Sequence, residues 1–305
     1  MLTSRVLRAG AALCALAVFT AAAPAFAAPA APAAPAAAVQ SQRISVEVVG
    51  SGPDVVLIPG LATSREVWRP LAAELAKTHR LHLVQISGFA GQPAPAGSEP
   101  AVVAPAAEEI AAYIRSAGLK QPAVIGHSLG GAAGLMLAER HPELVGRLMV
   151  VDALPFYSAM FGPGATVEGA KPFADQAYAQ VVGTDAASFA AGQQRTAAGL
   201  VKDPATRAKV VEWSVASDRV TLASAVREIM TTDLRPDLGE VRAPVTVLYA
   251  WDEASGLPVA AVDGLFKGEW AGVKGVQMVR VDGSLHFIMA DQPAKFAAEV
   301  ERFLK

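Results

Sequence analysis

Residues 123–134 read Ala-Val-Ile-Gly-His-Ser-Leu-Gly-Gly-Ala-Ala-Gly, with the serine at position 128. The apolar run 123–125 predicts a buried parallel strand, and the Ala/Leu/Met-rich sequence from Leu129 to Arg140 predicts a helix. Gly-x-Ser-x-Gly between a strand and a helix is typical of a nucleophile elbow, a tight turn that exposes a serine hydroxyl. The flanking glycines fit this turn because side chains there would collide with the neighbouring backbone. The rest of the chain should therefore supply the groups that act with Ser128.

Strand and helix patterns alternate along most of the 305 residues. The alternation predicts a mostly parallel, doubly wound α/β sheet. The first strand pattern, 44–48, alternates apolar and polar residues and is predicted to lie at an edge of the sheet. The other expected strands span residues 55–58, 81–86, 123–125, 148–151, 245–249 and 277–281, and the expected helices span 64–77, 102–117, 129–140, 259–270 and 293–304.

Between about residues 153 and 240 the strand signal stops and the chain is rich in alanine. Periodic apolar stretches predict helices there, so we expect a helical lid inserted into the sheet domain. Four apolar side chains early in this segment could form an acyl or alcohol pocket, or could equally pack the lid onto the sheet. They are Phe156, Tyr157, Met160 and Phe161.

The N-terminal residues have the pattern of an export signal. Residues 1–27 contain two arginines, an apolar run and an Ala-Phe-Ala cleavage site, which predict a secretory signal peptide. The apolar run is too short for a membrane-spanning helix. Residues 28–43 are rich in Ala and Pro and predict a linker, which leaves residues 44–305 as the folded domain. Cleavage would remove Cys14, the only cysteine, and leave a mature protein in the periplasm or outside a bacterial cell.

A serine nucleophile needs a base, and the chain has five histidines. Only His286 follows the last expected strand, after the turn Asp282-Gly283-Ser284 and before the closing helix. A serine at such an elbow is followed in the chain by the acid and then by the histidine, and His286 stands where this order requires the histidine. We therefore expect His286 to take the proton of Ser128.

The acid that orients this histidine should lie between it and Ser128 in the chain. Asp252 and Glu253 are neighbours after the strand 245–249, and Asp152 ends the strand 148–151. The shorter side chain of Asp252 suits a rigid loop at a strand end, so Asp252 is preferred, with Glu253 and then Asp152 as the alternatives.

Attack on a carbonyl creates an oxyanion that needs fixed N–H donors. The N–H of Leu129, directly after the serine, is one candidate. The second is the N–H of Leu61, in the turn Pro59-Gly60-Leu61-Ala62 after the first buried strand. This chemistry requires no metal and no organic cofactor.

Over residues 44–305 the chain resembles the α/β-hydrolase superfamily. The resemblance is carried by the turn at Gly60, residues 126–131, the acidic pair 252–253, and His286. The chain departs from the family pattern at Pro59, where a histidine is frequent, and at Gln85, where an aspartate is frequent. Counted without gaps, the family spacing would put the acid at Glu253.

The resemblance and the residues together predict a serine hydrolase that cleaves small or medium apolar carboxylic esters through an acyl-enzyme on Ser128. A proline-releasing serine aminopeptidase is an alternative, in which Glu168 or Asp175 would hold a substrate ammonium group. An acyltransferase and a non-catalytic binding protein on the same scaffold are further alternatives. The partner is expected to be a small-molecule ester or amide. Nucleic acid is not expected, because 26 basic and 28 acidic residues leave a net charge of −2 without a basic patch. The sequence does not indicate an oligomeric state.

Overall fold

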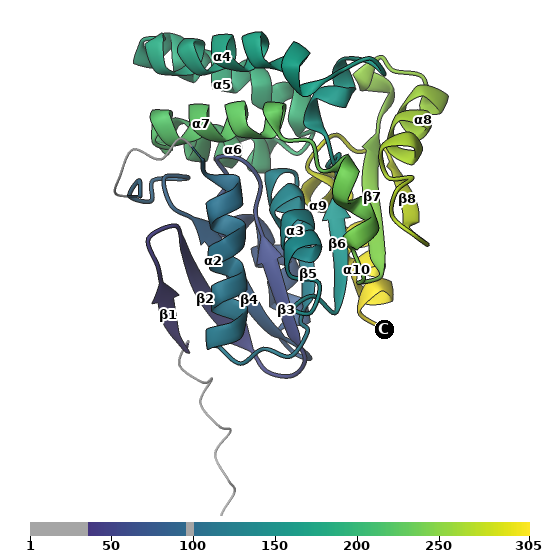
Figure 1. Ribbon diagram of the computed structural model, residues 1–305. Helices are drawn as coiled ribbons and strands as arrows, with labels where there is room; N and C mark the ends of the chain where they lie inside the picture. The colour runs from purple at the N-terminus through teal and green to yellow at the C-terminus, as the bar shows by residue number, and fades with distance from the viewer. Residues whose placement is uncertain (1–35, 96–100) are drawn as a thin grey trace, which may run out of the picture. The chain divides into compact units, whose positions relative to one another are not determined.

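The computed structural model describes residues 36–95 and 101–305, so the predicted signal peptide and residues 28–35 of the predicted linker lie outside the described residues. The described strands form one eight-stranded sheet with the order β1-β2-β4-β3-β5-β6-β7-β8 (Figure 1). β1 pairs antiparallel with β2, β2 pairs antiparallel with β4, and all further pairs are parallel. The strands are β1 (Ala36–Gln40), β2 (Ile44–Gly50), β3 (Asp54–Ile58), β4 (Arg80–Ile86), β5 (Ala123–His127), β6 (Arg147–Val151), β7 (Val245–Trp251) and β8 (Gln277–Asp282).

The predicted mostly parallel α/β sheet is thus confirmed, with two differences at its first edge. β1 falls inside the stretch 28–43 that the sequence predicts as a linker, because an alanine-rich segment carries no alternation that would indicate a strand. β2 consequently lies between β1 and β4 and is not the edge strand that its alternating pattern predicts.

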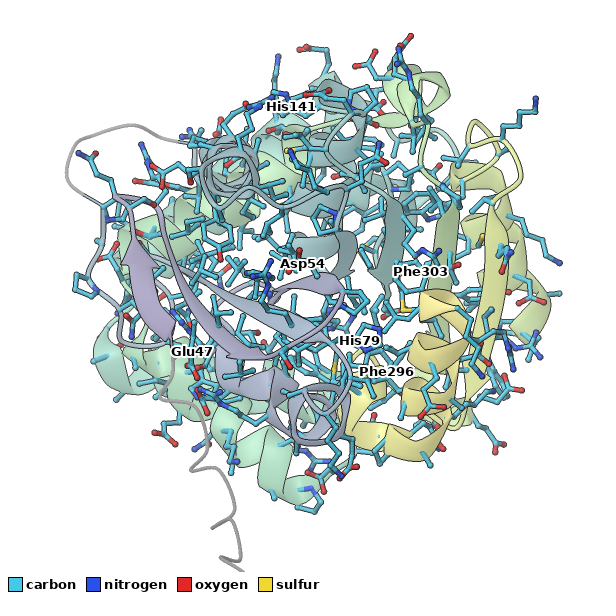
Figure 2. The ribbon with its side chains drawn as sticks, turned by 90° about the horizontal axis from the view of Figure 1, so that it is seen from below. Glu47, Asp54, His79, His141, Phe296 and Phe303 are labelled. Atoms are coloured by element: carbon cyan, nitrogen blue, oxygen red, sulfur yellow. The ribbon has the colours of Figure 1, made fainter. Side chains whose placement is uncertain are left out.

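Helices cover both faces of the sheet. α2, α3 and α8 supply apolar side chains to the core on one face, and α1 and α10 supply them to the core on the other. Seen along the strands, His141 at the end of α3 and Phe296 on α10 lie on opposite sides of the sheet (Figure 2). No helix in the described part of the chain is long and apolar enough to cross a membrane. The helices of this layer arrangement are η1 (Arg65–Trp68), α1 (Arg69–Leu75), α2 (Val103–Ser116), α3 (Leu129–Arg140), η4 (Glu253–Ser255), α8 (Val259–Glu269), α9 (Ile288–Asp291) and α10 (Pro293–Leu304).

Further helices stand between β6 and β7, in the stretch predicted to be a helical insertion. In Figure 1 they form the upper part of the molecule, with α4 and α5 above α6 and α7. Aspartates at the N-termini of α5, α6 and α7 each accept a backbone N–H, which supplies the first turn with a hydrogen-bond partner. The helices are η2 (Tyr157–Phe161), α4 (Val167–Gly183), α5 (Ala186–Leu200), α6 (Pro204–Ala216), α7 (Arg219–Thr231) and η3 (Arg235–Glu240). That this insertion acts as a lid stays a prediction.

The insertion is fastened to the sheet domain at the N-terminus of α2. That helix has no side-chain cap of its own, and the carboxylate of Glu228, on α7, accepts the N–H groups of Val103 and Ala104 at 2.8 Å each. A negative charge at a helix N-terminus satisfies unpaired N–H groups and interacts favourably with the helix dipole. Glu228 therefore joins α7 to the helix layer on one face of the sheet.

Glu139 is a buried acid on the helix that follows Ser128. Its side chain is 9% exposed, and its Oε1 has no hydrogen-bond partner among the described residues. Burial, with a further contribution from the charge of Asp237, raises the pKa of the Glu139 carboxyl to about 8. The folded protein thus keeps a proton at neutral pH that the unfolded chain releases.

The first prediction concerns the pH dependence of stability. The pKa of Glu139 is about 8 in the folded protein against 4.5 for an ordinary glutamate, so this proton favours folding fully below pH 4.5. Its contribution is lost as the pH rises to about 8, at up to ~1.4 kcal/mol per pH unit. Glu139→Gln should therefore gain stability relative to the wild type across this window, measured by urea unfolding at successive pH values.

Glu301→Gln, at an exposed position on α10, is the control and should follow the wild type at every pH. A constant difference between Glu139→Gln and the wild type from pH 5 to 8 would contradict the raised pKa.

Candidate active site

Ser128 lies at the junction of β5 and α3 in a strained backbone conformation, with φ 53° and ψ −121°. A positive φ is uncommon for residues other than glycine and costs about 1–3 kcal/mol, so surrounding contacts must hold it. The N–H of Ser128 donates to the carbonyl of Val151 at 2.9 Å, and its carbonyl accepts the N–H of Gly131 at 2.8 Å. The side chain is half-buried, which leaves the serine partly accessible.

The two glycines that flank the serine are required by backbone contacts. A Cβ at Gly126 would lie 2.1 Å from the carbonyl oxygen of Gly130. A Cβ at Gly130 would lie 2.3 Å from the carbonyl oxygen of Ile58, at the end of β3. Because these neighbours are backbone atoms, they cannot move aside as a flexible side chain can. The two glycines are therefore needed because the first turn of α3 packs closely on the adjacent strands β3 and β5.

His286 lies in the loop between β8 and α9, and Asp152 follows β6. The Nδ1 of His286 and the Oδ2 of Asp152 are 2.6 Å apart, and the two side chains are 23% and 14% exposed. A carboxylate can only accept here, so Nδ1 is the donor, and in the neutral ring Nε2 then keeps a free lone pair. The pair thus has the geometry of a base and its orienting acid.

Asp152 is itself fixed by the neighbouring strand. Its N–H donates to the carbonyl of Leu248 at 2.7 Å, and its Oδ1 accepts the N–H of Ala250 at 2.9 Å. Asp152 also has a positive φ of 53°, which turns the chain sharply out of β6. Both carboxylate oxygens are therefore engaged, one by the end of β7 and the other by His286.

The structure does not bring the preferred acid, Asp252, to His286. The Oδ2 of Asp252 accepts from the Nζ of Lys202 at 2.6 Å, and its Oδ1 accepts the N–H of Ala254 at 2.9 Å. Glu253 is exposed to solvent. The preference for Asp252 is corrected on this geometry, because a lysine from the helical insertion occupies its carboxylate, and Asp152 is the acid beside His286.

The turn after β3 lies next to the serine. A Cβ at Gly60 would be 3.3 Å from the Cβ of Ser128, so the backbone of Gly60 passes directly beside it. Leu61 follows Gly60 in this turn, and Leu129 is the first residue of α3, where a backbone N–H has no acceptor within the helix. The two predicted oxyanion donors thus stand on the two segments that border Ser128.

Sequence reasoning missed the residue that holds this turn. The buried amide of Gln85, on β4, donates to the carbonyl of Thr63 at 3.3 Å and accepts the N–H of Arg65 at 2.8 Å. Thr63 in turn donates its hydroxyl to the carbonyl of Leu61 at 2.9 Å. A glutamine inside the apolar run of β4 is the signal that could have indicated this role.

His127, the residue before Ser128, is fully buried beneath the loop that carries His286. Its Nε2 donates to the carbonyl of His286 at 3.1 Å, and the two rings are 4.6 Å apart. Burial, and secondarily the charge of His286, holds the pKa of His127 well below its usual range. His127 is therefore a neutral support for the loop of His286.

The apolar side chains expected to line a pocket are divided between interior and surface. Phe156 is buried, with the guanidinium of Arg235 4.6 Å from its ring centroid. Tyr157, Met160 and Phe161 are exposed by 39%, 51% and 69%. Met160 helps to line a groove of about 440 Å³ between η2 and α8, and Ser128 is not among the residues that line it.

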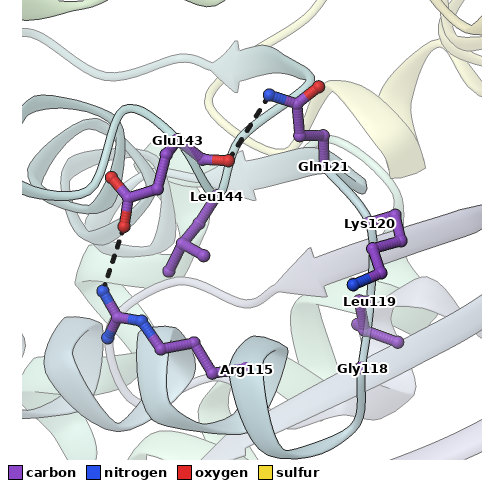
Figure 3. A pocket seen from close by; sticks show the side chains of 7 residues that line it. All are labelled: Arg115, Gly118, Leu119, Lys120, Gln121, Glu143 and Leu144. Carbon is purple, nitrogen blue, oxygen red and sulfur yellow. Dashed lines mark hydrogen bonds and ion pairs between the residues drawn. The ribbon is translucent and has the colours of Figure 1, made fainter.

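A second cavity, of about 460 Å³, lies at the other end of the strands (Figure 3). It is formed by residues 118–121, which precede β5, together with Arg115, Glu143 and Leu144. Two of its charged side chains, Arg115 and Glu143, already form an ion pair of 3.1 Å. The described residues also include no group of three or more His, Cys, Asp or Glu side chains that could hold a metal ion.

A mostly parallel sheet, a serine at a strained strand-to-helix turn, and a histidine–aspartate pair at the same end of the strands define the class of alpha/beta hydrolases. The model of the alpha/beta hydrolase family matches residues 55–299, and the chain belongs to this family. The predicted family resemblance is thereby confirmed.

Individual relatives cover parts of the chain. A pimeloyl-[acyl-carrier protein] methyl ester esterase of Aeromonas hydrophila is 37% identical over 116 residues, which are 38% of this chain and 44% of that relative. The chain thus spans less than half the length of that relative. A protein of the same name from Aliivibrio fischeri is 28% identical over 204 residues, 66% of this chain and 75% of the relative.

Solved structures show the same fold. A hydrolase from Pseudomonas aeruginosa superposes with a TM-score of 0.70 at 20% identity, over 86% of this chain and 94% of that one. The enol-lactonase from Burkholderia xenovorans gives a TM-score of 0.70 at 19% identity, over 86% and 96% of the two chains.

The second prediction tests the close packing at the elbow. Gly130→Ala should lower the free energy of unfolding by about 1–3 kcal/mol, because the new Cβ must displace the backbone of β3. Gly192→Ala, at an uncrowded position in α5, is the matched control and should leave stability unchanged or raise it by up to about 1 kcal/mol. Urea unfolding followed by circular dichroism measures both. Equal stability of Gly130→Ala and the wild type would rule out the tight contact.

Proposed function

We propose that the chain is a carboxylic ester hydrolase that acts through an acyl-enzyme on Ser128. The observation that carries the proposal is the 2.6 Å contact between His286 and Asp152 at the end of the sheet where the strained, half-buried Ser128 lies. Family membership supports the same chemistry, because an elbow serine with a histidine and an acid is its recurring arrangement.

In the first half of the reaction, the Nε2 of His286 accepts the proton of the Ser128 hydroxyl as its oxygen attacks the substrate carbonyl. The N–H groups of Leu129 and Leu61 stabilise the negative charge that develops on the carbonyl oxygen. Asp152 holds the tautomer of His286 and stabilises the imidazolium. The imidazolium then donates its proton to the leaving alcohol, and the acyl group stays on Ser128.

In the second half, a water molecule attacks the acyl group while His286 accepts its proton. The tetrahedral intermediate collapses, His286 returns the proton to Ser128, and the carboxylic acid leaves. Every proton in this cycle passes through one histidine nitrogen, so the orientation of the His286 ring is decisive.

Small or medium apolar acyl esters are the proposed substrates. The relatives named as methyl ester esterases support an ester with a small alcohol, and an uncharged leaving group suits a site bordered by leucine and glycine. The structural likeness to the enol-lactonase supports the fold alone.

The contacts of the insertion do not favour an aminopeptidase. Glu168 already pairs with Lys171 at 2.6 Å, and Asp175 pairs with Arg227 at 2.6 Å. Both acids are thus neutralised on the surface, and holding a substrate ammonium would require breaking an existing ion pair. No contact among the described residues favours an acyltransferase, so hydrolysis is the reaction we propose.

The third prediction concerns turnover. With p-nitrophenyl esters from acetate to octanoate, Ser128→Ala and His286→Ala should each lower kcat/KM by about ten-thousand-fold or more. Asp152→Asn should lower it by about a thousand-fold or more, because the wrong tautomer of His286 is then favoured. A fluorophosphonate probe should label the wild type at Ser128, as read by mass spectrometry of the labelled peptide.

Glu253→Gln is the control for the acid, since Glu253 is exposed, and its activity should match the wild type. Wild-type turnover in Asp152→Asn would remove Asp152 from the mechanism. A folded wild-type protein that neither reacts with the probe nor cleaves any ester of the series would favour a binding protein on this scaffold.

We also propose that the protein is exported and works in the periplasm or outside a bacterial cell. The support is the sequence pattern of residues 1–27, with Arg5 and Arg8 before an apolar run and the Ala25-Phe26-Ala27 site.

The fourth prediction is that the full chain, expressed in a bacterium, is recovered from the periplasm or medium with Ala28 as its N-terminus by Edman sequencing. Recovery from the cytoplasm with residues 1–27 intact would exclude export.

A further inference from the structure

The turn between α5 and α6, residues 200–203, lies against the loop that carries His286, residues 283–287. The N–H of Phe287, directly after His286, donates to the carbonyl of Leu200 at 3.2 Å. The first segment belongs to the helical insertion and the second to the sheet domain, so this contact joins the two next to the base.

The carboxylate of Asp291 binds both segments, on the histidine loop at the residue before His286. The Oδ1 of Asp291 accepts the N–H groups of Lys202 at 2.8 Å and Asp203 at 3.1 Å. Its Oδ2 accepts the N–H of Leu285 at 2.9 Å. The backbone is thus fixed at the residue before His286 and at the residue after it, in both cases with the insertion as a partner.

The side chain of Lys202 adds a third link. Its Nζ donates to the Oδ2 of Asp252 at 2.6 Å and to the carbonyl of Gly283 at 3.3 Å. Asp252 is 8% exposed and is held at the end of β7 by the N–H of Ala254, so it is a firm anchor. The lysine therefore connects the insertion, the end of β7 and the first residue of the histidine loop.

We infer that Lys202 is a positioning residue for His286 and that Asp252 is its anchor. The inference rests on the proposed function, because it assigns to the insertion a part in orienting the catalytic base. Asp152 fixes the ring of His286, whereas Lys202 and Asp291 fix the backbone that carries the ring. A displacement of about 1 Å at a catalytic group can cost a hundred-fold in rate, so a tether of this loop bears on turnover.

Lys202 acts on rate more than on stability. Its side chain is 45% exposed, and ion pairs with an exposed partner contribute little to the free energy of unfolding. Loss of the pair should leave the fold intact while residues 283–287 sample wider positions. The signature of positioning is thus a fall in kcat with KM nearly unchanged, since the groups that border the substrate stay in place.

The fifth prediction is that Lys202→Met and Asp252→Asn each lower kcat for a p-nitrophenyl ester by about tenfold, with KM within about twofold of the wild type. The double variant should lose no more than Lys202→Met alone, because Asp252 acts on the loop only through Lys202. Lys202→Arg should retain most of the activity, since it keeps a cation opposite Asp252. Lys171→Met is the matched control, because it removes a 2.6 Å lysine pair elsewhere in the insertion, and its kcat should equal that of the wild type.

A second measurement does not depend on turnover. In the Ser128→Ala background, amide hydrogen exchange of Leu285 and Phe287 should be about tenfold faster with Lys202→Met and unchanged with Lys171→Met. Unchanged exchange together with unchanged kcat in Lys202→Met overturns the inference, as does a loss confined to KM. Retained ester cleavage by Ser128→Ala would instead refute the proposed function, and the exchange result would still show whether Lys202 tethers the loop.

Discussion

The close approach of Gly130 to the end of β3 is the constraint on which the site depends. With a 2.3 Å gap between a Cβ at Gly130 and the Ile58 carbonyl oxygen, only glycine lets α3 begin against that strand. The chain can then turn from β5 into α3 within a single residue, which forces Ser128 into its positive φ. The N-terminus of α3 and the Gly60 turn are brought to the serine by the same contact. The positions of the proposed nucleophile and of the proposed oxyanion donors are therefore consequences of one packing arrangement.

Parallel strands then collect the remaining groups. The segments that follow the parallel strands all begin at the carboxyl end of the sheet, because these strands run in the same direction. The strands are β3, β5, β6, β7 and β8. Segments bearing Gly60, Ser128, Asp152, Asp252 and His286 therefore meet there although the chain separates them widely. The sequence was sufficient to predict this gathering, since strand ends and their order follow from the alternation of apolar runs and helices.

The choice of acid could not be predicted in the same way. Asp152 and Asp252 both follow buried strands, on adjacent positions of the sheet, and chain order admits either. The two aspartates differ in that Lys202 pairs with Asp252. Lys202 belongs to the helical insertion, and no sequence motif connects it with β7. The aspartates that start α5, α6 and α7 could have been identified as helix caps, but where the helices pack depends on contacts such as that of Glu228 with α2. Likewise β1 was missed, because an alanine-rich strand is defined by its partner and not by its own pattern.

In the proposed mechanism, His286 alternates between a neutral and a charged ring, and its neighbour His127 must not oppose that change. The two rings are 4.6 Å apart, so a positive charge on both would be strongly unfavourable. Burial keeps the pKa of His127 well below its usual range, and its Nε2 proton is committed to the carbonyl of His286. The charge that develops on His286 therefore meets a neutral ring on one side and the carboxylate of Asp152 on the other. The histidine inside the Gly-x-Ser-x-Gly motif thus holds the backbone of the proposed base by a hydrogen bond and stays uncharged.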